Sequence, residues 1–98
     1  MNFKLNIRQL ETIAERLEKS LEKEFSSVEL ICGFSLNVII EGGEPVFEIG
    51  VVINKNKHNR FNELGKRNFK IGISKKVHDF LNNAAPVERI IHYTYKDC

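Results

Sequence analysis

The stretch VELICGFSLNVIIEGGEPVFEIGVVIN, residues 28–54, contains two alternating apolar runs joined by a glycine pair. In the first run every second residue from Val28 to Ile40 is apolar, which is typical of a strand with one buried face. The pair Gly42-Gly43 supplies the positive φ angles that a tight hairpin turn needs. A second strand is expected from about Val46 to Asn54. This stretch therefore predicts an antiparallel hairpin.

The pairing of the two strands tests the hairpin independently. A two-residue loop at Gly42-Gly43 places these residues opposite one another: Val38 and Phe47, Leu36 and Ile49, Phe34 and Val51, Cys32 and Ile53. Every pair is apolar, and a shift by one residue would turn one strand's apolar side chains to the other face. The same register gathers small and polar residues on the reverse face, including Gly33 and Gly50, which we interpret as a bent, solvated surface.

The residues before the hairpin predict a long amphipathic helix. Asn6 is placed to cap it, Gln9 to reach back to the cap, and Leu5 to pack onto Leu10. Apolar residues then recur with helical spacing as far as Phe25. The glutamates of this helix form one stripe, which is typical of a solvated face. The alternative is that the stripe contacts a basic partner or the basic segment of this chain.

The residues after the hairpin predict a loop, a strand, a helix and a last strand. The stretch 55–68 shows no sustained period and is expected to be a long basic loop, with room for one helical turn around Phe61 to Leu64 that Gly65 ends. Phe69–Ile73 is expected to be a short strand. Ser74 is expected to cap a second helix that Pro86 closes, and a last strand is expected over Glu88–Tyr95. The predicted fold is α+β, in the order α-β-β-β-α-β, with a mainly antiparallel sheet and two helices packed on one face.

Length and composition predict one domain spanning residues 1–98. Apolar residues make up 42% of the chain and charged residues 29%, which is typical of globular proteins rather than disordered ones. No apolar run is long enough for a membrane helix, and the first residues lack the zones of a signal peptide. We therefore expect a cytoplasmic protein that makes no membrane contact. We expect Cys32 to be a small core residue and Cys98 a free terminal thiol.

The sequence offers no catalytic or cofactor-binding motif. The three histidines and two cysteines lack zinc-type spacing, so no metal site is expected. Nucleophile elbows and phosphate-binding glycine loops are absent from the sequence. A non-enzymatic protein without a cofactor is the prediction.

Charge is distributed unevenly along the chain. Residues 1–53 carry five Lys/Arg against nine Asp/Glu, whereas residues 54–98 carry ten against four. Such asymmetry is informative about partners rather than about the fold. The candidate partner-binding or anion-binding residues all fall in the basic 55–76 region: Lys55, Lys57, Arg60, Phe61, Lys66, Arg67, Ser74, Lys75 and Lys76.

The end of this region suggests an anion site. Lys75 and Lys76 directly follow the expected cap Ser74, where the helix dipole disfavours positive charge, and a bound anion would offset that cost. The alternative is that both lysines are simply solvated.

Gly72, Ser74, Lys75 and Lys76, together with Pro45 and Phe47, are similar to a segment of double-stranded RNA-binding domains. Those domains share the α, β, β, β, α order and begin their second helix against phosphates. The resemblance implies phosphate contact by Lys75 and Lys76. The chain departs from that pattern at Asp79, where a basic residue is expected, and in its additional last strand, so we do not assign it to that family.

The leading prediction is a small inhibitor or adaptor that binds a protein partner with an acidic surface through residues 55–76. A chain rich in Lys, Asn and Ile is typical of AT-rich bacterial or phage genomes, in which small inhibitors are common. The alternative is an RNA- or DNA-binding module that uses the same basic surface, with Phe61 stacking on bases. A third hypothesis is a homodimer formed through an edge strand or the Gly33/Gly50 face.

Overall fold

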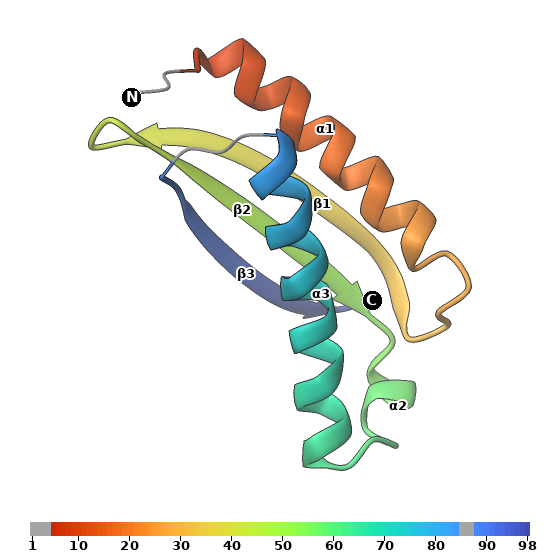
Figure 1. The fold of residues 1–98 in the computed structure, drawn as a ribbon. Helices are drawn as coiled ribbons and strands as arrows, with labels where there is room; N and C mark the ends of the chain where they lie inside the picture. The colour runs from red at the N-terminus through yellow and green to blue at the C-terminus, as the bar shows by residue number, and fades with distance from the viewer. Residues whose placement is uncertain (1–4, 85–87) are drawn as a thin grey trace.

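A computed structural model describes residues 5–84 and 88–98, and its α+β class confirms the predicted one (Figure 1). Its elements are α1 (Ile7–Glu24), β1 (Ile31–Glu41), β2 (Glu44–Ile53), α2 (Lys55–His58), α3 (Glu63–Ala84) and β3 (Ile90–Asp97). The sheet has the order β1-β2-β3. β1 pairs with β2 antiparallel and β2 with β3 parallel, so the sheet is mixed rather than mainly antiparallel.

The hairpin forms in the predicted register. Val38 lies opposite Phe47, Leu36 opposite Ile49 and Phe34 opposite Val51, and both turn glycines have positive φ angles of 60° and 81°. The register is interrupted by a bulge between Ile31 and Gly33, which places Ile31 rather than Cys32 opposite Ile53. The predicted pairing of Cys32 with Ile53 is therefore wrong, and the exposed Cys32 is the extra residue of the bulge.

Helix α1 begins as the sequence predicts. The Asn6 side chain accepts a hydrogen bond from the Gln9 backbone N–H (2.9 Å), and the Gln9 side chain accepts one from the Asn6 N–H (3.0 Å), which completes a capping box. One face of the helix is buried, at Leu10, Ala14, Leu17 and Leu21.

Helix α3 replaces the predicted strand. Residues 69–73 are helical, and Ser74 lies in the middle of α3 instead of at its start. The buried residues Ile73, Val77 and Leu81 are four apart, which is the spacing of one helical face, and the half-buried Phe69 precedes them at the same interval. The loop predicted over 55–68 is wrong as well, because it contains α2 and the first residues of α3. Pro86 lies outside the described residues.

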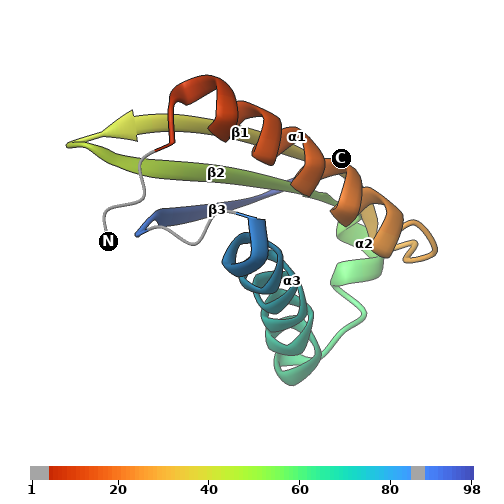
Figure 2. The same ribbon diagram turned by 45° about the horizontal axis from the view of Figure 1, so that its top comes forward.

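Both long helices cover the same face of the sheet, as predicted (Figures 1 and 2). Buried residues of α1 and α3 form one core cluster with Phe47, Ile49 and Val51 of the central strand. The reverse face carries no helix in the described part of the chain. There the Ser35 hydroxyl fills the space beside Gly50, since a Cβ on Gly50 would lie 2.4 Å from it.

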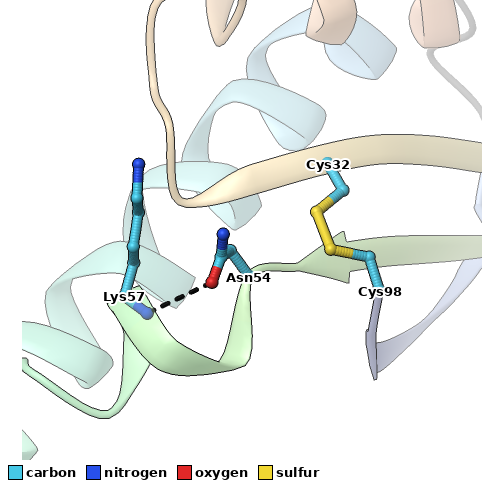
Figure 3. The surroundings of a disulfide bond; sticks show 4 residues. All are labelled: Cys32, Asn54, Lys57 and Cys98. Atoms are coloured by element: carbon cyan, nitrogen blue, oxygen red, sulfur yellow. Dashed lines mark hydrogen bonds between the residues drawn. A yellow bond between two sulfur atoms is a disulfide. The ribbon is translucent and has the colours of Figure 1, made fainter.

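The cysteines are paired, which corrects the prediction of a free Cys98. A disulfide joins Cys32 in the β1 bulge to Cys98, with their Cα atoms 6.5 Å apart (Figure 3). The Cys98 backbone N–H also donates to the Ile53 carbonyl at the end of β2 (2.9 Å). The C-terminal residue is therefore tied to both other strands of the sheet.

Replacing Gly72 by alanine is expected to stabilise the protein by about 0.5–1 kcal/mol, because glycine inside a helix loses more conformational entropy than alanine. The position is exposed, and a Cβ there would meet no atom within 4 Å. Urea denaturation measures the change. A loss of stability would contradict a helical conformation at Gly72.

The protein is expected to lose stability as the pH rises above 10.0. Burial raises the pKa of both Tyr93 and Tyr95 above their ordinary value of 10.0. Their neutral forms are favoured in the folded state, so this contribution is complete below pH 10.0 and is lost as the pH rises through the folded pKa values. Urea midpoints measured across this range, with Tyr93→Phe as the control, test it. A pH dependence unaltered in Tyr93→Phe would exclude a role for that phenol.

Candidate functional site

Six of the nine predicted site residues lie together at one end of the molecule. Lys55 and Lys57 belong to α2, Arg60 and Phe61 to the turn after it, and Lys66 and Arg67 to the start of α3. We call residues 55–67 the α2–α3 corner. Figure 1 shows that α2 and the first half of α3 lie beyond the end of the sheet. The corner is therefore accessible from several sides.

Two asparagines fix the path of the corner. The Asn54 side chain accepts a hydrogen bond from the Lys57 backbone N–H (3.3 Å) and caps α2, as Figure 3 shows. The Asn62 side chain accepts one from the Gly65 N–H (2.7 Å) and caps α3 in the same way. Each cap satisfies a donor that has no partner inside its helix. Both turns of the corner are thus specified by local sequence.

Aromatic contacts hold α2 and the turn against α3. The His58 and Phe69 rings pack edge to face, with centroids 6.2 Å apart. Phe61 lies against Gly65, where a Cβ would come within 3.3 Å of the phenylalanine ring. Glycine at position 65 therefore lets the Phe61 ring rest on the first turn of α3, while 42% of the Phe61 residue stays exposed.

Several cations of the basic region are paired with acids. Lys57 forms an ion pair with Glu29, Lys66 with Glu63 (3.9 Å) and Lys76 with Glu24 of α1 (3.5 Å). The hydrogen bond and charge of Lys57 lower the pKa of the Glu29 carboxyl. Within the described part of the chain these pairs neutralise part of the positive charge.

The remaining cations of the basic region form no ion pair and account for its net positive charge. Among the described residues, no acid pairs with Lys55, Arg60, Arg67 or Lys75. Lys70, which belongs to the same basic region, stacks over the Tyr95 ring of β3 at 4.8 Å from its centroid. The unpaired charge is concentrated at the corner, with Lys75 further along α3.

The predicted anion site at Ser74 is wrong. Backbone N–H groups in the middle of a helix bond to carbonyls of the preceding turn, so none is available for an anion. The Ser74 hydroxyl lies 3.4 Å from the Tyr93 hydroxyl, and Lys76 is held toward α1 by Glu24. Ser74, Lys75 and Lys76 therefore do not converge on one point.

Helix α3 is also incompatible with the predicted resemblance to double-stranded RNA-binding domains. That resemblance requires a third strand before the second helix and a helix start at Ser74, and α3 occupies both positions. Nothing matches this chain among protein-family models, curated proteins or solved structures. A function has to be inferred from the chemistry of the surface itself.

The sequence reading missed two exposed apolar side chains of α3, one inside the corner and one just after it. Leu64 is 62% exposed and Ile71 is 55% exposed, and their separation of seven residues places them on one face of α3. With Phe61 they form a group that we call the apolar triad. Leu64 and Ile71 lie two helical turns apart, and the unpaired cation Arg67 lies between them in the sequence, so apolar and cationic side chains alternate along this part of α3.

Other chemistries find little support in the described residues. They contain no group of three His, Cys, Asp or Glu side chains placed to hold a metal ion. Among the helices in residues 5–84 and 88–98, none is long and apolar enough to cross a membrane. The surface around the apolar triad is the strongest candidate site.

Proposed function

We propose that this chain is a non-enzymatic interaction protein, a small inhibitor or adaptor, that binds a protein partner through the α2–α3 corner. The observation that carries the proposal is the apolar triad of Phe61, Leu64 and Ile71, exposed beside the unpaired cations Arg60 and Arg67. The partner surface that fits is an apolar groove with an acidic rim.

Burial of the apolar triad would supply most of the affinity. Fully burying a Leu, Ile or Phe side chain gains about 1.5–3 kcal/mol, and interface energy is usually concentrated in a few such residues. The rim cations contribute mainly to association rate and orientation. The rigid caps at Asn54 and Asn62 reduce the ordering that binding requires.

RNA or DNA binding through the same corner is the second candidate. Phe61 among Lys55, Lys57 and Arg60 has the composition of a stacking platform in a basic groove. Two features favour a protein instead. Leu64 and Ile71 have no planar group for stacking on a base, and Lys57 and Lys66 are already paired with acids.

The test compares how well a protein partner is captured by the wild-type chain and by a Leu64→Glu/Ile71→Glu double variant. Both residues are exposed on a helix that tolerates glutamate, so the variant is expected to fold. Ile7→Glu, which alters an apolar residue 38% exposed at the start of α1, is the matched control. A partner should be retained by the wild type and the control, and bind the double variant at least about 100-fold more weakly, since two buried side chains are lost.

Two results would overturn the proposal. One is a partner that binds the double variant as tightly as the wild type. The other is binding of random RNA or DNA that falls steeply with salt and that Arg60→Glu/Arg67→Glu abolishes, which is the behaviour of phosphate contacts. The second result would establish the nucleic-acid function in place of the protein partner.

A cytoplasmic location is part of the same proposal, and the Cys32–Cys98 bond weighs against it, since disulfides persist mainly in oxidising compartments. In the cytoplasm both cysteines should be thiols. Rapid alkylation of intact producing cells, followed by mass spectrometry of the chain, is expected to label both. A chain protected from alkylation until it is reduced would indicate an oxidising compartment.

A further inference from the structure

The two outer strands of the sheet differ in how their free edges are protected. On β1, the Leu36 backbone N–H donates to the Glu18 side chain of α1 (3.1 Å), and the bulge at Cys32 interrupts the strand. Side chains that occupy edge groups, and bulges, are devices that prevent a further strand from pairing. The β1 edge is therefore protected.

The free edge of β3 can be assigned to particular backbone groups. Cys98 donates its N–H to the Ile53 carbonyl of β2, so the backbone groups of even-numbered residues point toward β2. Backbone groups alternate in direction along a strand. The N–H and C=O groups of Ile91, Tyr93 and Tyr95 therefore point away from the sheet.

In the described part of the chain this edge has no bulge, proline or charged residue before Lys96. The register of β3 with β2 is unbroken, so β3 has no bulge. From Ile90 to Tyr95 the strand contains no proline, lysine or acid, and the first charged residue of β3 is Lys96. An unbroken edge of β-branched and aromatic residues is a template for pairing with another strand.

We propose that β3 pairs antiparallel with β3 of a second copy of this chain, around a two-fold axis at Tyr93. This register places Ile91 opposite Tyr95 of the second copy on the helix-covered face. On the open face it places His92 opposite Thr94 of the second copy. The outward backbone groups then form hydrogen-bonded pairs, each exchanging two bonds, and the two sheets become one continuous six-stranded sheet.

Self-complementarity selects this register. A shift by one residue would bring covered and open faces together and is excluded. An axis at Thr94 would place Ile91 opposite Asp97 of the second copy, whereas the axis at Tyr93 places Arg89 opposite Asp97. Opposite charges directly across an antiparallel pair are stabilising. An axis at His92 would place Glu88 opposite Lys96 of the second copy instead, but it pairs only residues 90–94 of β3, whereas the axis at Tyr93 pairs residues 90–96.

The dimer is independent of the proposed function. None of the paired residues, from Arg89 to Asp97, belongs to the α2–α3 corner or the apolar triad. The Leu64→Glu/Ile71→Glu variant should therefore dimerise like the wild type, and loss of one property need not entail loss of the other.

Two measurements test the dimer. Sedimentation equilibrium from micromolar to millimolar concentration should show a species of twice the chain's mass. Chains carrying His92→Cys and chains carrying Thr94→Cys, both at exposed positions, are then oxidised separately and as a mixture. Residues opposite each other at a non-hydrogen-bonded position have Cα atoms about 4.5 Å apart, which suits a disulfide.

A covalent dimer is expected only in the mixture, because like cysteines are diagonal neighbours about 7–8 Å apart, beyond disulfide reach. Crosslinking by His92→Cys alone would place the axis at His92 and overturn the register. A monomer at every concentration, or a dimer without a crosslink in the mixture, would overturn the pairing of β3 itself.

Discussion

Phe47→Ala is expected to lower the free energy of unfolding by about 3–5 kcal/mol. Phe47 is 0% exposed at the middle of the central strand. It belongs to the cluster in which α1 and α3 meet the sheet. Removing its ring leaves a cavity that three elements would have to collapse to fill, and they can relax only in part. Urea denaturation followed by circular dichroism gives the change.

Phe61→Ala is the matched control for this prediction. It removes the same ring from an exposed position against the first turn of α3. A loss below about 1 kcal/mol is expected, as for most surface substitutions. Comparable losses in the two variants would mean that Phe47 does not lie in a common core. The control also separates stability from binding, since Phe61 belongs to the apolar triad.

The hairpin was predictable because two independent features of its sequence indicate the same strand register. The alternation of Leu36 and Val38 with polar neighbours fixes the buried face, and the Gly42-Gly43 turn fixes the partners. The errors lie at the start of the hairpin: the predicted strand began at Val28 whereas β1 begins at Ile31, and Cys32 is the extra residue of a bulge that the alternating pattern does not indicate. Helix α1 was predictable for a similar reason, since its cap and its period agree.

Helix α3 was not predictable from a short run of residues. Phe69, Ile71 and Ile73 alternate with polar or small residues, and a run of five residues fits a strand as well as a helix. The longer spacing of four from Phe69 to Leu81 distinguishes the two, but the apparent cap at Ser74 divided it. Ile71 was thereby assigned to the sheet, although it lies on the exposed face of α3.

The basic residues of the candidate site were predictable from the sequence, but its exposed apolar residues were not. Lys55 to Arg67 are recognisable as a basic cluster from sequence alone, and the structure brings them to one corner. The partners of Lys57 and Lys76 are acids distant in the chain, so their neutralisation depends on tertiary contacts. The exposure of Leu64 follows from the projection of α3 beyond the sheet, which no local pattern encodes.

Reduction of the Cys32–Cys98 disulfide is expected to lower the free energy of unfolding by about 4 kcal/mol. The two residues are separated by 66 positions, and closing a loop of that length restricts the unfolded chain strongly. Urea denaturation with and without a reductant measures the loss. Cys98→Ser should show the same loss and no response to the reductant. Equal stability of the oxidised and reduced chains would contradict the expectation.

The loss should appear first at the end of β3, because of where the bond lies. Within the described residues β3 pairs only with β2, whereas the disulfide links the residue after β3 to the β1 bulge across the end of β2 (Figure 3). Reduction leaves the Cys98 N–H bond to Ile53 as the terminal contact. Amide hydrogen exchange at Lys96 and Cys98 should therefore accelerate on reduction while exchange at Val38 and Phe47 in the hairpin changes only with global stability. Acceleration of equal size in both regions would show that the bond acts through the unfolded chain alone and does not anchor β3.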